Sequence, residues 1–214
     1  MKTIAFFNNK GGVGKTSLVY HLAWMFADHG IKTLAVDLDP QANLSSMFLD
    51  EERLAQMWND GEKSSIFDSL EPLMNRTGDI LPSTHVERMN EYLGLVPGNL
   101  ALSRFEDLLS ENWPKCLDGG VDAFRVITAF HRIILSASEQ MSAEVVLIDV
   151  GPNLGAINRS ALIAAEQVVI PLAPDMFSLQ GLKNFGPSLR DWRKGWKKRL
   201  EELPANAGIS APSG

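Results

Sequence analysis

The chain has 214 residues, of which 45% are hydrophobic and 21% are charged, and its formal net charge is -6. This length and composition fit one globular α/β domain with a substantial core. They exclude a protein that is basic over its whole surface, although a local basic face remains compatible with them. No apolar run approaches the roughly 20 residues that span a bilayer. The one cysteine, Cys116, excludes a disulfide within the chain, and we therefore expect a cytoplasmic protein.

The first 50 residues predict one β-turn-α-β unit. Residues 2–8 are β-prone and lead into a glycine-rich turn. Residues 15–29 have apolar side chains at helical spacing, and Gly30 ends that helix. A buried strand over 33–38 follows. This order is the opening unit of a parallel sheet with right-handed crossovers.

The rest of the chain continues the alternation of strands and helices. The fold class that we predict is α/β, with a mostly parallel twisted sheet, helices on both faces and a single domain over residues 1–203. The 143–149 strand is a continuous apolar run, which is typical of a central parallel strand. The predicted elements are, in order, a short helix capped by Ser64 or Ser65, a strand within 91–99, a helix over 99–110, helical segments over 121–141, strands over 143–149 and 167–172, a helix over 178–202, and a flexible tail over 204–214.

The turn after the first strand has the residues of a phosphate-binding loop. Glycines let the backbone curl around phosphate oxygens, and the N-terminus of the following helix attracts an anion. Lys15 supplies a mobile charge for the phosphates, and Thr16 offers a hydroxyl to Mg²⁺. Asn9 stands where the usual pattern has its first glycine. The predicted nucleotide-binding residues are Lys10, Gly11, Gly12, Val13, Gly14, Lys15, Thr16 and Ser17.

The motif "KGGVGKT" resembles the deviant Walker A motif of the ParA/MinD family of dimeric ATPases. The resemblance implies ATP and Mg²⁺ as ligands and makes Lys10 the signature lysine. In that family, this lysine reaches the phosphates bound by the other subunit of a nucleotide-sandwich homodimer. A cation from a partner neutralises charge that develops on the transferred phosphoryl group, as an arginine finger does.

Two further segments supply carboxylates at predicted strand ends. "LAVDLDPQANLS" resembles the first switch region of the family, which implies that Asp39 positions or polarises the attacking water and that Asp37 supports the loop and the metal shell. "VVLIDVGPNLG" resembles Walker B, with Asp149 holding Mg²⁺ through a water. The predicted catalytic residues are thus Lys10, Lys15 and Asp39, and the predicted metal residues are Thr16, Asp37 and Asp149.

The chain departs from the family at two places. Gly151-Pro152 stands where the family has Pro-Pro, and the glycine adds backbone freedom to the second switch. The family also continues through a further strand and C-terminal helices, whereas this chain ends in "ISAPSG". The resemblance covers residues 1–50 and 143–190 well and the middle only in outline.

A basic cluster in "LRDWRKGWKKRLEEL" is the candidate DNA contact. Four of its cations recur at i, i+3, i+4 and i+7, on one helix face, while leucines and tryptophans lie on another. Nonspecific DNA binding needs only phosphates neutralised by Lys and Arg, and a solvated face or an anionic-membrane contact is the alternative. The candidate residues are Arg190, Arg193, Lys194, Lys197 and Lys198.

The resemblance as a whole predicts a ParA-type, nucleoid-associated ATPase that hydrolyses ATP slowly to partition or position a cargo. A ParB-like adaptor would stimulate hydrolysis, and we do not expect membrane association. Three alternatives stay open: a MinD-like membrane-positioning ATPase, a metabolic P-loop enzyme that transfers phosphate to a carboxylate, and a nucleotide-binding scaffold without turnover. Lys10 argues against the metabolic enzyme, and the small polar residues at the end of the chain do not resemble the membrane helix of MinD.

Overall fold

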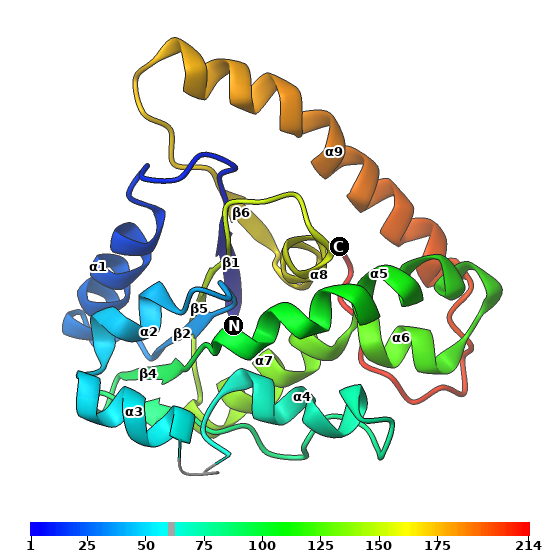
Figure 1. Cartoon of the computed structure of the whole chain (residues 1–214), viewed down its shortest axis with the longest axis horizontal. Coiled ribbons are helices and arrows are strands. Elements are labelled where there is room, and N and C mark those ends of the chain that lie inside the picture. Colours follow the sequence, from blue (N-terminus) through cyan, green and yellow to red (C-terminus); the bar gives the residue numbers. More distant parts are fainter. Residues whose placement is uncertain (60–62) are drawn as a thin grey trace.

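The computed structural model describes residues 1–59 and 63–214 and has a sheet between two layers of helices (Figure 1). The order of strands is β3-β4-β2-β5-β1-β6. All neighbouring strands are parallel except β3 and β4, which confirms the predicted mostly parallel sheet. The strands are β1 (Lys2–Phe6), β2 (Thr33–Asp37), β3 (Glu87–Arg88), β4 (Leu93–Val96), β5 (Val145–Asp149) and β6 (Gln167–Val169).

Helices cover both faces of the sheet, as predicted. Figure 1 shows α1 and α2 on one side of the strands and α4 to α8 on the other. None of the helices in the described part of the chain is both long and apolar enough to cross a membrane. The helices are α1 (Lys15–Asp28), α2 (Asn43–Phe48), α3 (Glu51–Asn59), α4 (Ile66–Met74), α5 (Phe105–Lys115), α6 (Val121–Ile127), α7 (Ala129–Met141), α8 (Ala156–Ala164) and α9 (Met176–Glu201), with 3-10 turns η1 (Leu100–Arg104) and η2 (Cys116–Asp118).

The central strand β5 shows how the sheet divides the core in two. Leu147 packs in the cluster beneath α1, whereas Val146 and Ile148 pack in the larger cluster beneath α4 to α8. Successive side chains of a strand point to opposite faces, so a strand covered on both sides needs an unbroken apolar run. The run in β5 thus explains its place between β1 and β2, and the predicted central position is confirmed.

Several predicted boundaries differ from the observed ones. The helical span 121–141 is divided into α6 and α7 at Thr128, whose hydroxyl donates to the carbonyl of Phe124. The last helix begins at Met176 rather than 178, because Asp175 caps it. Ser65 caps α4 through a capping box with Asp68, in agreement with one of the two predicted caps.

The C-terminal segment 204–214, which we expected to be flexible, lies against the core. Ile209 and Ala211 pack on the larger apolar cluster, and the indole nitrogen of Trp196 donates to the carbonyl of Pro212 at 2.9 Å. Trp196 is fully buried. Its ring lies near those of Trp113 and Phe124, at centroid distances of 6.2 and 6.1 Å. The tail thus contacts the core through side chains and a carbonyl acceptor that composition alone does not reveal.

We expect Trp196→Ala to lower the free energy of unfolding by about 3–5 kcal/mol, because it leaves a cavity and removes the anchor of the tail. Urea unfolding followed by circular dichroism measures this change. Lys197→Ala, an exposed neighbour on the same helix, is the control and should change stability by no more than about 0.5 kcal/mol. Equal effects of the two substitutions would contradict the anchoring role of Trp196.

Candidate functional site

The phosphate-loop residues connect β1 to α1 at the carboxyl edge of the sheet. Gly12 and Gly14 have φ angles of 74° and 77°, in the left-handed region that favours glycine. Gly14 is the N-cap of α1 and offers no side-chain acceptor to the first turn of the helix. The backbone N–H groups of that turn therefore face the loop, and the positive end of the helix dipole adds to their attraction for an anion.

Lys15 and Thr16 both bind the carboxylate of Asp149 at the end of β5. The Lys15 amine lies 2.5 Å from Asp149 Oδ1, and the Thr16 hydroxyl donates to Oδ2 at 2.7 Å. Lys15 is 8% exposed and Asp149 is fully buried. Burial raises the pKa of Asp149 above its ordinary value, although Lys15 opposes this shift. Three predicted residues from two distant segments thus meet at one point.

Asp37, at the end of β2, is directly opposite Asp149 in the strand register. One of its carboxylate oxygens accepts from both the backbone N–H and the hydroxyl of Ser45, at 2.8 and 2.7 Å. The Ser45 hydroxyl oxygen accepts in turn from the N–H of Gly98 at 2.8 Å. Burial, followed by the charge of Asp149, raises the pKa of Asp37 to about 7. Asp37 therefore ties the end of β2 to the first turn of α2 through Ser45.

Asp39 lies two residues after Asp37 and is 4% exposed. It lines a cleft together with the phosphate-loop residues. Its backbone N–H donates to Asp37, and its carboxylate accepts from the N–H of Gln41 at 3.0 Å. A Cβ atom at Gly151 would lie 3.4 Å from Asp39 Oδ1. A side chain at position 151 would thus contact the Asp39 carboxylate.

A cleft of about 520 Å³ lies over the phosphate loop and Asp39, whereas the buried Asp37 and Asp149 do not line it. It contains all eight predicted loop residues and the predicted catalytic Asp39. Among the described residues, no group of three or more His, Cys, Asp or Glu side chains converges to hold a metal. The Thr16 hydroxyl and the Asp149 carboxylate offer only a few oxygen ligands. They fit a cation that keeps several waters and takes phosphate oxygens as further ligands, as Mg²⁺ does. The lining residues are Lys10, Gly11, Gly12, Val13, Gly14, Lys15, Thr16, Ser17, Asp39, Gln41, Asn43, Ser46, Met47 and Pro152.

The signature lysine, Lys10, contacts an acid of its own subunit. Its amine lies 2.8 Å from Asp175 Oδ2, at the start of α9. Asp175 is not among the predicted site residues. An aspartate at the expected start of a helix is an N-cap signal, and this signal marks the helix boundary but not the ion pair.

Two further residues missed from the sequence hold the second switch. Glu106, from α5, accepts from the N–H groups of Ala156 and Ile157 at the start of α8. Asn158 donates to the carbonyls of Gly151 and Asn153, at 2.7 and 2.6 Å. Glu106 and Asn158 each bind backbone groups of another element or turn. The spacing of residues within one element therefore does not predict these contacts.

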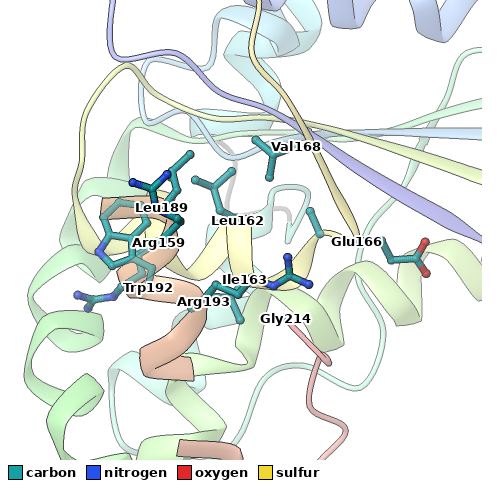
Figure 2. Close-up of a pocket in the computed structure, with 11 residues that line it drawn as sticks. Arg159, Leu162, Ile163, Glu166, Val168, Leu189, Trp192, Arg193 and Gly214 are labelled. Carbon is teal, nitrogen blue, oxygen red and sulfur yellow. The ribbon is translucent and has the colours of Figure 1, made fainter. Parts of the chain in front are cut away.

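The candidate DNA residues are all exposed on α9, far along the chain from the phosphate loop. The opposite side of the helix is docked, since Leu189 and Trp192 pack against the core. Arg190 and Arg193 also line a groove of about 310 Å³ between α8 and α9. Figure 2 shows Arg193 and Arg159 there beside the apolar Leu162 and Leu189.

Comparisons with known proteins agree with this architecture. Residues 1–202 match the family AAA_31, described as an AAA domain. The chain is 32% identical over 190 residues to the "Putative replication protein A" of Rhizobium rhizogenes, a match that covers 86% of this chain and 43% of the relative. It is 32% identical over 181 residues to the "Chromosome-partitioning ATPase Soj" of Treponema pallidum, with 85% of this chain and 60% of that relative covered. The chain spans about 42% to 63% of the length of the curated relatives it matches.

Two solved structures are also similar to this chain. Protein DIP2308 from Corynebacterium diphtheriae has a TM-score of 0.85 and 32% identity, over 94% of this chain and 68% of that one. Cobyrinic acid a,c-diamide synthase from Mycobacterium smegmatis, crystallised with an ATP analog and magnesium, has a TM-score of 0.67 and 26% identity, over 91% and 69%. With its phosphate loop and strand order, the chain belongs to the AAA domain family AAA_31 and to the ParA/MinD group of P-loop ATPases with a deviant Walker A motif.

Proposed function

We propose that this chain is a ParA-like ATPase that binds Mg²⁺ and ATP, forms an ATP-sandwich homodimer, binds DNA nonspecifically and hydrolyses ATP to partition or position a cargo. The observation that carries the proposal is the meeting of Lys15, Thr16 and Asp149 beneath a glycine loop at a helix N-terminus. Such an arrangement binds phosphates and a hard cation. The cargo would be a plasmid, a chromosome locus or a protein assembly.

On nucleotide binding, the Lys15 amine would exchange the carboxylate of Asp149 for the phosphates of the nucleotide. The amine now neutralises the buried Asp149 and would supply its charge to the β- and γ-phosphates, while Thr16 and Asp149 would hold Mg²⁺. Bound there, Mg²⁺ would neutralise charge on the phosphate oxygens. The ATP analog and magnesium in the similar synthase support this choice of ligands.

Hydrolysis would depend on Asp39 and on Lys10. Asp39 lines the cleft, where its carboxylate is suited to orient the attacking water. Lys10, from the other protomer of a dimer, would stabilise the charge that develops on the phosphoryl group. Because a group supplied in trans is needed, the isolated subunit would turn over slowly. A ParB-like adaptor would accelerate the reaction.

DNA binding would use the exposed cations of α9, which are Arg190, Arg193, Lys194, Lys197 and Lys198. The helix is docked by its apolar side, so these residues are free to neutralise phosphates without unfolding any part of the chain. We propose a nucleoid-associated location in the cytoplasm on this basis, with DNA rather than a membrane as the surface that the protein binds.

A metabolic phosphoryl-transfer enzyme is the second candidate, because one similar solved structure is the diamide synthase named above. That function requires a small acceptor substrate and gives Lys10 no role in trans. A MinD-like membrane ATPase is a third candidate, which binding to lipid vesicles would reveal. The oligomeric state with ATP separates the first two candidates.

We expect the Asp39→Ala protein to be a dimer with ATP and Mg²⁺ and a monomer with ADP, since loss of the water-orienting carboxylate preserves bound ATP. Adding Lys10→Ala should abolish the dimer but leave nucleotide binding. Sedimentation velocity gives the mass of each variant, and Lys2→Ala, an exposed lysine at the start of β1, is the control. A protein that stays monomeric with ATP bound would contradict the sandwich dimer and favour the metabolic enzyme.

Asp37 should make the nucleotide-free protein less stable as pH rises. Its pKa is raised to about 7 in the folded chain, whereas an aspartate in the unfolded chain titrates near 4. The folded state thus holds one more proton between these values, and its stability falls as pH increases. From pH 5 to pH 8, the wild type should lose about 2–3 kcal/mol relative to Asp37→Asn. Urea unfolding in EDTA measures both proteins, and parallel pH profiles would rule out this role of Asp37.

Replacing Arg193 and Lys197 together by alanine should weaken the binding of ATP-loaded protein to DNA equally for unrelated sequences. The slope of log affinity against log salt should become shallower by roughly 0.9 for each DNA phosphate that the variant no longer neutralises. Fluorescence anisotropy with two unrelated duplexes gives both quantities, and Lys2→Ala again controls for charge. An unchanged salt slope would exclude this face of α9 as the DNA-binding surface.

A further inference from the structure

The ion pair between Lys10 and Asp175 is the feature that the proposed function leaves unexplained. The amine and the carboxylate oxygen are 2.8 Å apart, and the residues are separated by 165 positions in the sequence. The side chains are 42% and 37% exposed. The ion pair is therefore accessible to solvent, and it can break without opening the core.

Asp175 uses its two carboxylate oxygens for different partners. Oδ1 accepts from the backbone N–H of Ser178 at 2.7 Å and so caps α9, while Oδ2 accepts from Lys10. Lys10, followed by the Ser178 N–H, lowers the pKa of Asp175 to about 2. The carboxylate is consequently ionised at neutral pH and binds the amine as a full negative charge.

The loop around Lys10 is attached to the same segment at a second point. The side chain of Asn8 donates to the carbonyl of Pro171 at 2.6 Å and accepts from the backbone N–H of Lys10 at 2.9 Å. The backbone of the lysine is thus held beside the 171–175 segment, and Asp175 holds its side chain on the same side.

We propose that Asp175 is a positioning residue that keeps the Lys10 amine within its own subunit and thereby opposes ATP-dependent dimerisation. The proposal rests on the proposed function, in which Lys10 acts on the nucleotide of a partner subunit. One amine cannot occupy both places, so each protomer must break its internal ion pair before the sandwich closes. The fraction of chains with a free lysine then scales the apparent dimer affinity.

The cap of α9 makes this exchange reversible. When Lys10 leaves, Asp175 keeps the Ser178 N–H and remains at the positive end of the helix dipole. The start of α9 therefore stays folded in both states. An exposed ion pair of this kind changes an equilibrium by about two- to five-fold. With two protomers in each dimer, we expect a combined effect of roughly 4- to 25-fold.

Asp175→Asn separates the two roles of the side chain. Asparagine caps a helix as well as aspartate does, but it carries no charge to bind an amine. Asp191→Asn is the matched control, because it removes the same charge from an exposed position of the same helix. Both substitutions are made in wild type and in Lys10→Ala.

Sedimentation equilibrium with a non-hydrolysable ATP analog and Mg²⁺ measures the dimer dissociation constant of each protein. Asp175→Asn should lower it by roughly 4- to 25-fold in the presence of Lys10, whereas Asp191→Asn should not. In the Lys10→Ala background, which should not dimerise, Asp175→Asn should not restore the dimer, because the amine that it would release is absent. In the nucleotide-free protein, reductive methylation read by peptide mass spectrometry should modify Lys10 faster in Asp175→Asn, with exposed Lys194 as internal reference.

The outcomes distinguish this inference from the function on which it rests. A wild type that dimerises with the analog, with the same dissociation constant for Asp175→Asn, would overturn the positioning role and leave the ATPase proposal intact. An unchanged methylation rate of Lys10 would overturn it as well. A wild type that never dimerises would overturn the sandwich dimer and this inference together.

Discussion

The ion pair between Lys15 and Asp149 is the interaction on which the rest of the site depends. Three carboxylates lie at the carboxyl edge of the sheet because β2 and β5 are in register at Asp37 and Asp149 and because Asp39 follows directly. All three are nearly or fully buried. Removing a carboxylate from water is unfavourable unless a cation or a proton compensates it. The Lys15 amine binds one of these carboxylates, that of Asp149. Its position therefore decides how much negative charge the carboxyl edge of the sheet can carry.

A consequence is that the charges of these protein groups do not balance by themselves. Lys15 neutralises Asp149, while burial and then the charge of Asp149 raise the pKa of Asp37 and so disfavour its ionised form. A phosphate that attracted Lys15 would leave Asp149 without its partner, and a divalent cation entering with the phosphate would restore the balance. The geometry therefore favours joint binding of an anion and a metal over binding of either alone.

Much of this architecture was predictable because it depends on local patterns. Unbroken apolar runs identified the strands, and glycines beside Lys15 and Thr16 identified the loop. Strand ends identified Asp37, Asp39 and Asp149.

Neither α2, α3 nor β3 was predicted; α2 and β3 are short, and α8 lies in a segment whose apolar and small residues suit a strand as well as a helix. The partners of Lys10 and Trp196 depend on contacts between segments more than 15 residues apart. Spacing within one element does not encode such contacts, and neither the ion pair at Asp175 nor the packed tail was predicted.

The second switch shows how tertiary contacts replace a missing local restraint. Gly151 stands where the family has proline, and a glycine at that position gives the free backbone more conformations to lose on folding. In this structure, Asn158 binds the carbonyls of Gly151 and Asn153, and Glu106 fixes the N–H groups at the start of α8. These hydrogen bonds restrict the segment from both ends, so the glycine does not imply a loose switch. Glu106 belongs to α5, whose Trp113 ring contacts the guanidinium groups of Arg159 and Arg199. The helix that restrains this segment thus contacts both α8 and α9.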